Sequence, residues 1–421
     1  ILHQALGQVL IISPWNYPFH ISMTTIVAAL AAGNTVVFKP SEVTPLSGLI
    51  ESLMEASPLL KRAVSIAYGT GATAQRLIDQ RPAKIFFTGS ARTGKKILQQ
   101  AAEYLIPVDL ELGGKDPMIV FDDVNLNRTV AGCLWGAMTN AGQSCTSVER
   151  VYVQRGIYDA FKAKLKSDAA SLVVNAGDRG DADMGGITAS FQLDIIKRQV
   201  EEARAAGADI LCGGEVLGGS ELLGGSEVQG EGGCFYLPTI VEGATADMAL
   251  LSEETFGPVI VLLPFDSEEK VITESNHSDF GLSASVWSKD LKRAERVARQ
   301  LEVGAVSINN VMLTEGNPAL PFGGNRRVHY QAPEYFIDIG GLPPATRSAR
   351  ASVNFSLDEY VRLPDRNGDR RCYVDAQIAQ HVQDLRQAWA GPLILKSSFR
   401  SPRFVDAFSN TVAADGSGWV H

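Results

Sequence analysis

The stretch "GQVLIISPWNYPFHISMTTIVAALAAGNTVVFKPS", residues 7–41, decides the fold expected for this chain. It opens with a short apolar run at 7–13, continues through a helix-forming segment at 24–33, and closes with a second apolar run at 34–41. Strands without polar alternation are buried on both faces, which is typical of a parallel sheet covered by helices. The stretch therefore predicts a strand–helix–strand unit with parallel strands.

The same alternation continues along the chain. Further short strands are predicted at 63–69, 84–90, 107–114 and 117–123, and helix-like sequence follows the first two. A second block of alternating strands and helices follows "NAGQSCTS", residues 140–147. We expect an α/β protein with a doubly wound parallel sheet and a second α/β domain.

Composition excludes several classes of partner. Of the 421 residues, 45% are hydrophobic and 20% are charged, and the net charge is −9. Excess negative charge argues against a nucleic-acid or anionic-membrane surface. No apolar run approaches the roughly 18 residues of a membrane span. The five cysteines are odd in number and widely spaced, which favours reduced thiols in a cytoplasmic protein over a disulfide framework or a structural metal site.

Cys145 is the candidate nucleophile. Its neighbours in "NAGQSCTS" are small and polar, whereas a cysteine kept for packing usually has apolar neighbours. A helix starting near Thr146 would offer free backbone N–H groups that lower the thiol pKa and stabilise an oxyanion. The octapeptide alone also allows a small buried cysteine at the end of a strand or helix.

Two polar residues follow predicted strands, at the edge where open α/β sheets bind ligands. Glu111, in "LELGGKDP", suits a general base whose pKa is raised by burial, or else a turn carboxylate that caps a helix. Asn16, in "SPWNYPF", carries a side-chain amide able to donate to an oxyanion. Its neighbour Trp15 is either a pocket wall or a buried turn residue.

Other residues suit a nucleotide. Lys39 and Glu42, in "FKPSE", lie at the end of the second predicted strand, where a ribose would be held. Gly89 and Ser90, in "FTGSARTG", precede a predicted helix whose N-terminus suits a pyrophosphate. Glu254, in "SEETFGPV", is either a ligand for a ribose diol or a solvated acid on a loop.

These motifs occur in the order and wording of one family. From about Gly7 to Asn325, roughly three quarters of its length, the chain resembles the NAD(P)-dependent aldehyde dehydrogenase superfamily. The resemblance rests on the motifs PWN, KPSE, FTGS, ELGGK, GQxC, EExFGP and PFGG.

The resemblance implies oxidation of an aldehyde at Cys145. The thiolate would attack the carbonyl to give a thiohemiacetal, with Asn16 and the backbone N–H of Cys145 holding the oxyanion. Hydride transfer to NAD(P)+ would leave a thioester, and Glu111 would activate the water that hydrolyses it. Members that pass the acyl group to coenzyme A tend to lack this glutamate, so the expected product is a free carboxylic acid.

The resemblance also implies a cofactor site. Its expected residues are Trp15, Lys39, Glu42, Gly89, Ser90, Glu254 and Phe256. Lys39 and Glu42 would bind the adenosine ribose and Ser90 the pyrophosphate. Glu254 would bind the nicotinamide ribose, with Phe256 beside the ring. Glu42 would compete with a 2′-phosphate, which favours NAD, with NADP as the alternative.

The expected domains follow from the same resemblance. An NAD-binding domain is expected over 1–113, lacking the family's usual N-terminal part, and a catalytic domain over 114–325. Residues 326–352 are expected to be a linker or a remnant of the oligomerisation segment. Residues 353–421 are expected to be a small C-terminal segment, with an incomplete peptidase-like domain as one interpretation. Its "SSFRSP" (397–402) weakly resembles the start of a zinc D-Ala-D-Ala carboxypeptidase-like domain, without the ligands of a metal site.

Two other functions stay open at this point. The missing family segments allow an inactive or unstable fragment that retains the cofactor fold. A cysteine hydrolase or acyltransferase using Cys145 would need a histidine partner, and none of the six histidines lies in a recognisable dyad context. Members of the family form homo-oligomers, but the altered end of the family region does not carry this state over to the chain.

Overall fold

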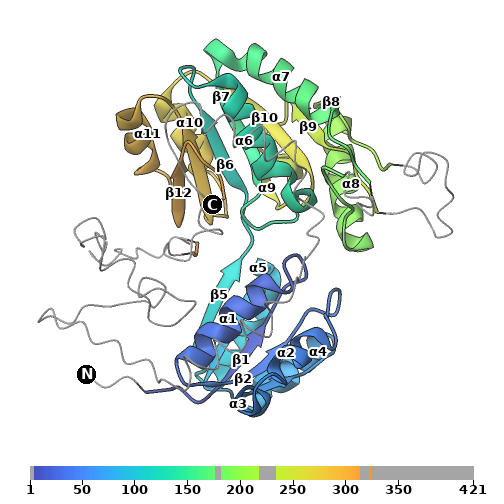
Figure 1. The fold of residues 1–421 in the computed structure, drawn as a ribbon. Coiled ribbons are helices and arrows are strands. Elements are labelled where there is room, and N and C mark those ends of the chain that lie inside the picture. Colours follow the sequence, from blue (N-terminus) through green and yellow to red (C-terminus); the bar gives the residue numbers. More distant parts are fainter. Residues whose placement is uncertain (1–3, 176–181, 218–233, 313–321, 325–421) are drawn as a thin grey trace, which may run out of the picture. The chain divides into compact units, whose positions relative to one another are not determined.

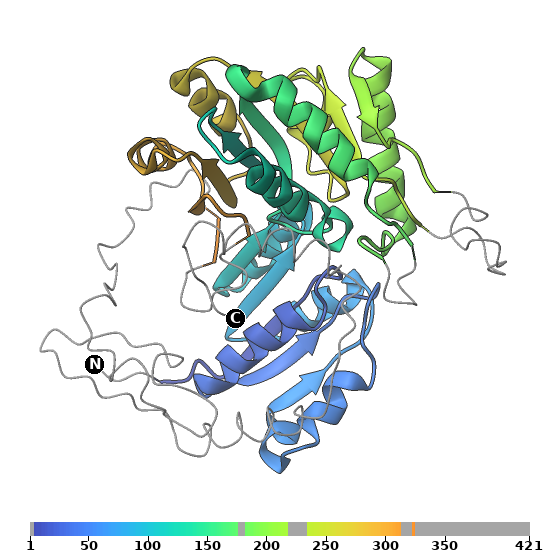
Figure 2. The same ribbon diagram turned by 45° about the horizontal axis from the view of Figure 1, so that its top comes forward.

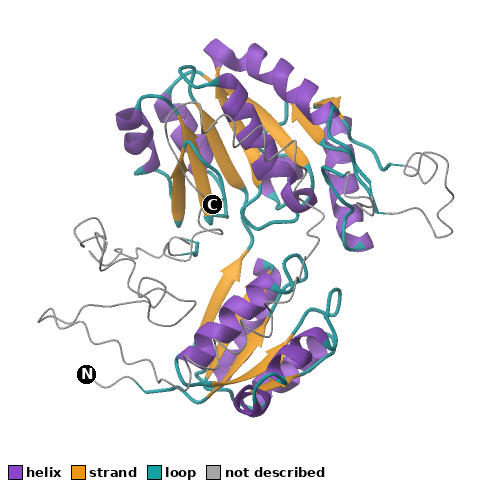
Figure 3. Ribbon diagram, in the orientation of Figure 1, coloured by secondary structure: helices purple, strands orange, loops and turns teal. Residues whose placement is uncertain are grey.

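The computed structural model describes residues 4–175, 182–217, 234–312 and 322–324. They divide into two compact units, the first ending at Leu112 and the second beginning at Gly113 (Figure 1). Each unit is a sheet with helices packed on it (Figure 3), which confirms the predicted α/β fold class. The expectations for 326–352 and for 353–421, including the carboxypeptidase-like resemblance, lie outside the described residues.

The first unit is a five-stranded, entirely parallel sheet with the strand order β3-β2-β1-β4-β5. Its strands are β1 (Gln8–Ile12), β2 (Thr35–Lys39), β3 (Val64–Ile66), β4 (Lys84–Gly89) and β5 (Val108–Leu112). Its helices are α1 (His20–Ala31), α2 (Leu49–Met54), α3 (Pro58–Ala63), α4 (Gly71–Asp79) and α5 (Ala91–Glu103).

Alternate side chains of β1 enter two different cores. Val9 and Ile11 pack in a cluster with residues of α1, α2 and α3, whereas Leu10 and Ile12 pack in a cluster with residues of α4 and α5. Successive strand residues point to opposite faces, so both faces of the sheet are covered. This burial explains the continuous apolar run of β1 and gives the doubly wound arrangement.

The strand order reverses between β1 and β4. From β1 the chain continues outward through β2 and β3, and it then returns to the other side of β1 with β4 and β5. In open parallel sheets, ligands bind outside the carboxyl ends of the strands at such a switch point. The turns after β1 and β4 are therefore the expected floor of a ligand site.

The second unit is a seven-stranded sheet with the strand order β12-β11-β6-β7-β10-β9-β8 (Figure 1, Figure 2). Its strands are β6 (Asp116–Val120), β7 (Val148–Gln154), β8 (Asp209–Cys212), β9 (Thr239–Glu242), β10 (Val259–Phe265), β11 (Ser283–Trp287) and β12 (Ala305–Ile308). Its helices are α6 (Leu126–Met138), α7 (Tyr158–Ala170), α8 (Ser190–Ala205), α9 (Ala249–Ser252), α10 (Glu268–Asn276) and α11 (Leu291–Ala298), with short 3₁₀ turns η1 (Thr139–Gly142) and η2 (Arg155–Ile157). Within the described residues, the pairing of β8 with β9 is antiparallel and the other pairings are parallel.

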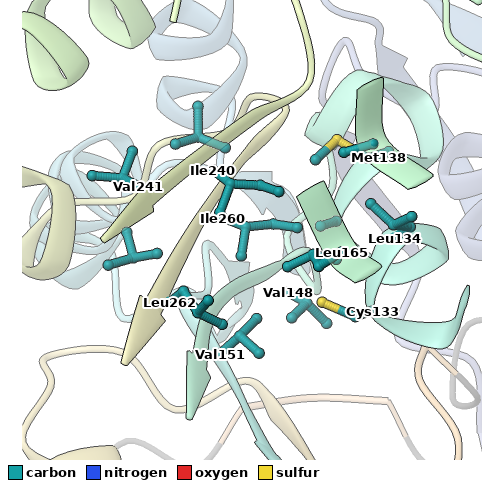
Figure 4. Packing of buried hydrophobic residues seen from close by; sticks show 14 of the residues in the cluster. Cys133, Leu134, Met138, Val148, Val151, Leu165, Ile240, Val241, Ile260 and Leu262 are labelled. Carbon is teal, nitrogen blue, oxygen red and sulfur yellow. The ribbon is translucent and has the colours of Figure 1, made fainter. Parts of the chain in front are cut away.

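The larger core of this unit lies between the sheet and helices α6, α7 and α8. Figure 4 shows Val151 and Leu262 of the central strands facing Leu165 of α7 and Cys133 of α6. Tyr152, the next residue along β7, packs instead in a second cluster with residues of α10 and α11. The second sheet is thus also covered on both faces by helices.

The sequence prediction missed some elements. Strands β9 and β12, each four residues long, were not predicted from the sequence. Helix α1 begins at His20, four residues before the predicted start of its segment. In the described part of the chain, no helix is long and apolar enough to cross a membrane.

Candidate active site

Cys145 lies in a turn between η1 and β7, and it is partly buried. The backbone N–H of Ser147 donates to the carbonyl of Ser144 at 3.1 Å, and that of Thr146 donates to the Ser144 hydroxyl at 3.4 Å. The chain then enters β7 at Val148 without forming a helix. The interpretation that a helix beginning near Thr146 activates the thiol is therefore wrong, because the segment after Cys145 is a strand.

Two glycines bring the cysteine loop against neighbouring loops. A Cβ atom on Gly114, of the ELGGK motif, would collide with the backbone carbonyl of Cys145. Gly142 has a φ of +70°, and a Cβ atom there would collide with the carbonyl of Gly257. Since neither clash could be relieved by a side chain moving aside, glycine is required at both positions. The three motifs ELGGK, GQxC and EExFGP thus meet in one place.

Glu253 and Glu254 have opposite surroundings. Glu253 is exposed and pairs with Arg198 at 2.6 Å, which lowers the pKa of its carboxyl. Glu254 accepts a hydrogen bond from the backbone N–H of Gly114 at 3.2 Å. Burial first, and then the nearby charge of Glu149, raises the pKa of Glu254 to about 8. The alternative of a solvated loop acid fits Glu253 and not Glu254.

Phe256 has an unusual backbone conformation for its residue type. Its φ is +52°, in the left-handed region that non-glycine residues rarely adopt. Its backbone N–H donates to Glu149 at 2.9 Å, while Gln192 donates to the carbonyl of the preceding Thr255 at 2.8 Å. These bonds fix the loop that carries Glu254 and Phe256.

Sequence reasoning missed Lys115 and Glu149, which form a buried ion pair behind this loop. The Lys115 side chain is 0% exposed and the Glu149 side chain is 2% exposed. Their positions in the sequence gave one indication. Lys115 directly follows ELGG and Glu149 lies in "SVERVYV", so both place a charge at the beginning of a buried strand. Buried charges need partners, but Asp116 and Arg150 are buried at the same strand starts, so the sequence did not show which charges pair.

The polar residues of the first unit lie at the carboxyl ends of its strands. Trp15 and Asn16 belong to the turn after β1, which is joined to the end of β2 by a bond from the Ser13 N–H to the Lys39 carbonyl at 3.1 Å. Thr44 donates its hydroxyl to the carbonyl of Trp15 at 2.9 Å. The turn after β1 and the loop after β2 are therefore held together.

Lys39 and Glu42 form an ion pair. The Lys39 ammonium, which is 3% exposed, donates to Glu42 at 3.0 Å and to the carbonyl of Pro40 at 2.9 Å. The Glu42 side chain is 50% exposed. Its partial burial opposes ionisation, but hydrogen bonds from its own backbone N–H and from Lys39 outweigh this and lower its pKa. Glu42 thus presents a charged carboxylate toward solvent.

Ser90 caps helix α5. Its hydroxyl accepts a hydrogen bond from the backbone N–H of Thr93 at 3.3 Å, directly after the last strand residue, Gly89. The cap places the N-terminus of a 13-residue helix just beyond the end of β4. Such a helix N-terminus favours an anionic group.

Glu111 is the second-to-last residue of β5 and lies beside Thr88 of β4. Burial, followed by the charge of Asp109, raises the pKa of Glu111 to about 7. Its Oε2 atom is buried and has no hydrogen-bond partner among the described residues. A carboxyl in this state is half ionised near neutral pH, as a general base requires.

The expected site residues therefore fall into two sets, each described within its own unit. The first unit carries Trp15, Asn16, Lys39, Glu42, Gly89, Ser90 and Glu111, and the second carries Cys145, Glu254 and Phe256. In the described ranges, no three His, Cys, Asp or Glu side chains are placed to hold a metal ion.

A doubly wound sheet with polar residues at its switch point, followed by a second α/β unit with a cysteine loop, defines a two-unit α/β protein with a candidate nucleophile. The family model for the aldehyde dehydrogenase family matches residues 1–333. The chain belongs to this family.

Relatives and solved structures agree with this assignment. The chain is 43% identical over 319 residues to 4,4'-diapolycopene aldehyde oxidase from Methylomonas sp., covering 76% of this chain and 57% of that protein. It is 40% identical to a betaine aldehyde dehydrogenase from Cereibacter sphaeroides, covering 77% and 64%. The solved betaine aldehyde dehydrogenase of Staphylococcus aureus in complex with NAD+ matches with a TM-score of 0.72 at 33% identity, covering 76% and 62%.

The coverage of these relatives is partial. The chain spans 57% of the length of the first relative and 64% of that of the second. Family membership therefore concerns the shared region, and the activity of the whole protein is a separate question.

Proposed function

We propose that this protein oxidises an aldehyde to a carboxylic acid, with NAD+ as the hydride acceptor and Cys145 as the nucleophile. The observation that carries the proposal is the meeting of three loops at Gly114, which packs on the carbonyl of Cys145 and donates to Glu254. The proposed nucleophile loop and the proposed ribose-binding carboxylate thereby both contact the backbone of Gly114.

The chemistry of the first unit fits a dinucleotide. The ionised Glu42, held by Lys39, suits the hydroxyls of a ribose and repels a 2′-phosphate, which favours NAD over NADP. The capped N-terminus of α5 at Ser90 suits a pyrophosphate. Trp15 lies in the turn after β1 and Gly89 is the last residue of β4, the two strands on either side of the switch point. When bound, the nicotinamide ring would supply the acceptor for the hydride.

In the proposed reaction, the Cys145 thiolate adds to the aldehyde carbonyl and forms a thiohemiacetal. Asn16 and the backbone N–H of Cys145 donate to the oxyanion that develops on the former carbonyl oxygen. Loss of hydride from that carbon leaves a thioester on Cys145. Glu254 and Phe256 orient the cofactor through its ribose and ring during this step.

Hydrolysis completes the cycle. Glu111, with its raised pKa and unpartnered Oε2, accepts a proton from water as the water adds to the thioester. The carbon–sulfur bond then breaks, the carboxylic acid leaves, the Cys145 thiolate is restored, and Glu111 gives its proton to solvent. One aldehyde, one water and one NAD+ give one acid, one NADH and one proton.

The test is direct. Purified protein mixed with a panel of aldehydes and NAD+ is expected to produce NADH, measured by its absorbance, together with one equivalent of acid. A cooperative thermal transition that NAD+ raises, without any NADH from the panel, would instead support the alternative of an inactive protein that retains the cofactor fold. Substrate identity follows from the same panel, which includes betaine aldehyde and 4,4'-diapolycopene aldehyde, the aldehydes in the names of the two relatives.

A further inference from the structure

Most hydrogen bonds that the Glu149 carboxylate accepts come from the loop that carries Glu254 and Phe256. Its Oε1 accepts from the backbone N–H groups of Phe256 at 2.9 Å and of Thr255 at 3.2 Å. Its Oε2 accepts from the Thr255 N–H at 3.0 Å and from the Lys115 ammonium. Two successive backbone donors of the loop thus depend on one side chain from the start of β7.

Lys115 contacts both Glu149 and the same loop. Its ammonium donates both to Glu149 and to the hydroxyl of Thr255, the latter at 3.0 Å. Its backbone carbonyl accepts from the side chain of Arg150 at 2.9 Å. The ion pair therefore links the residue after ELGG, the start of β7 and the EExFGP loop.

One of the hydrogen bonds to Glu149 comes from Phe256, the residue whose backbone is strained. Phe256 has a φ of +52°, a conformation that persists in non-glycine residues only when the surroundings over-determine it. The Glu149 carboxylate supplies this constraint by accepting from the N–H of that same residue. Removal of the acceptor would break the bonds from these two successive donors and allow the loop to relax.

We propose that Lys115 and Glu149 are positioning residues that preset the Glu254–Phe256 loop for the nicotinamide half of the cofactor. This inference rests on the proposed function. In it, the pair touches neither substrate nor cofactor and acts through the backbone N–H groups of Thr255 and Phe256 and the hydroxyl of Thr255. A purely structural ion pair would contribute to stability and leave the geometry of the loop unchanged.

Neutral double variants separate these two roles. Removing one partner alone would strand a buried charge and endanger folding, so both are changed together. Lys115→Met with Glu149→Met removes every acceptor, whereas Lys115→Met with Glu149→Gln keeps one carboxamide oxygen for the N–H of Phe256. Asp116→Asn is the matched control, because Asp116 is 3% exposed and its carboxylate bonds to Ser283 instead of the loop.

The first measurement is hydrogen exchange of the full chain without cofactor. The amides of Thr255 and Phe256 are expected to exchange about tenfold faster or more in the double methionine variant, and at an intermediate rate in the Met/Gln variant. Asp116→Asn is expected to leave them unchanged. Unchanged exchange in the folded double methionine variant would overturn the proposal.

The second measurement separates positioning from the proposed function. In the double methionine variant, KM for NAD+ is expected to rise about tenfold, with partial rescue in the Met/Gln variant and a smaller change in KM for the aldehyde. An active wild type whose KM for NAD+ is unaffected by both double variants would overturn the positioning role. A wild type that makes no NADH would overturn the proposed function, while the exchange measurement would still report on the loop.

Discussion

The backbone N–H of Gly114 donates to the Glu254 carboxylate at 3.2 Å, although the two residues lie 140 positions apart in the chain. The α-carbon of the same glycine faces the carbonyl of Cys145 with no room for a side chain. One residue therefore sets the separation between the candidate nucleophile loop and the candidate ribose ligand. The second glycine of ELGGK is therefore a position where a side chain would disturb both loops.

Gly114→Ala is expected to damage activity more than stability. The added Cβ meets a backbone carbonyl that cannot rotate away, so the cysteine loop must shift. We expect kcat/KM to fall by about 100-fold or more, since small misplacements of reacting groups are costly. The unfolding free energy should fall by about 1–3 kcal/mol, as for other overpacked sites.

Gly71→Ala is the matched control for Gly114→Ala. Gly71 opens helix α4, and a Cβ atom there would meet nothing within 4 Å. Its activity and its stability, measured by denaturant titration, should stay near those of the wild type. Equal activity of the two variants would contradict the close packing of Gly114 on Cys145.

Cys145→Ala is expected to abolish NADH formation, including any first turnover, because no thiohemiacetal can form. Cys133→Ala serves as the control, since Cys133 is fully buried in the core and its pKa is raised by burial. That variant should keep its activity and lose about 1 kcal/mol of stability. Iodoacetamide should inactivate the wild type by alkylating Cys145 and leave Cys133 unmodified, as peptide mapping would show.

The first sheet could be predicted well because burial on both faces leaves a strong signal. Runs such as that of β1 have no polar alternation, and Gly33 marks the end of the following helix segment. In the second sheet, the four-residue strands β9 and β12 were not predicted from the sequence. Their pairing is decided by neighbours that are remote in sequence.

The individual site residues could be named from their motifs, but their environments could not. Nothing local in "SEETFGPV" distinguishes Glu253, which pairs with Arg198, from Glu254, which bonds to Gly114. Both partners come from distant segments of the chain. For the same reason, the Lys115–Glu149 pair could not be predicted from the sequence. The helix predicted after Cys145 was wrong because the chain there enters β7 and pairs with neighbouring strands.

Glu111→Gln is expected to stop the reaction after one turnover. Without a base to activate water, the thioester accumulates, and steady-state turnover should fall by about 1,000-fold. A rapid burst of NADH equal to the enzyme concentration should remain, measured by stopped-flow absorbance. Absence of a burst with a folded variant would contradict the order of hydride transfer before hydrolysis.

The pH dependence of kcat in the wild type should reflect the ionisation of Glu111. Glu111 acts as a base only when ionised, and its pKa is raised to about 7. If hydrolysis limits turnover, kcat should increase as the pH rises through about 7 and level off above it. The burst rate of Glu111→Gln should lack this transition.

Glu42→Gln is expected to relax the preference for NAD. The variant removes the charge that would repel a 2′-phosphate but keeps a hydrogen-bonding side chain beside Lys39. The ratio of kcat/KM for NADP to that for NAD should rise about tenfold, a change of about 1.4 kcal/mol. Glu55→Gln makes the same charge change in an exposed pair with Lys61 and should leave the ratio unaltered.

Glu254 should make the cofactor-free protein less stable as the pH rises. Its pKa increases from an ordinary value of 4.5 to about 8, chiefly because of burial. Between these values the folded state holds a proton that the unfolded chain releases, so stability falls through this window and the loss is complete above about pH 8. Glu254→Gln removes the titration, and its unfolding free energy relative to the wild type should improve by roughly 1–3 kcal/mol from pH 5 to pH 8.

Glu253→Gln is the control with the opposite sign. The pKa of Glu253 is lowered by Arg198, so its charge stabilises the fold at neutral pH and that contribution is lost as the pH falls. Its removal should cost a small amount of stability at pH 8, because the pair is exposed. Denaturant titrations of both variants and the wild type between pH 5 and pH 8.5 measure the two slopes. If Glu254→Gln follows the wild-type slope across this range, the Glu254 carboxylate is already ionised at pH 5, and the burial that raises its pKa is overcome by the N–H of Gly114 and the charge of Lys115.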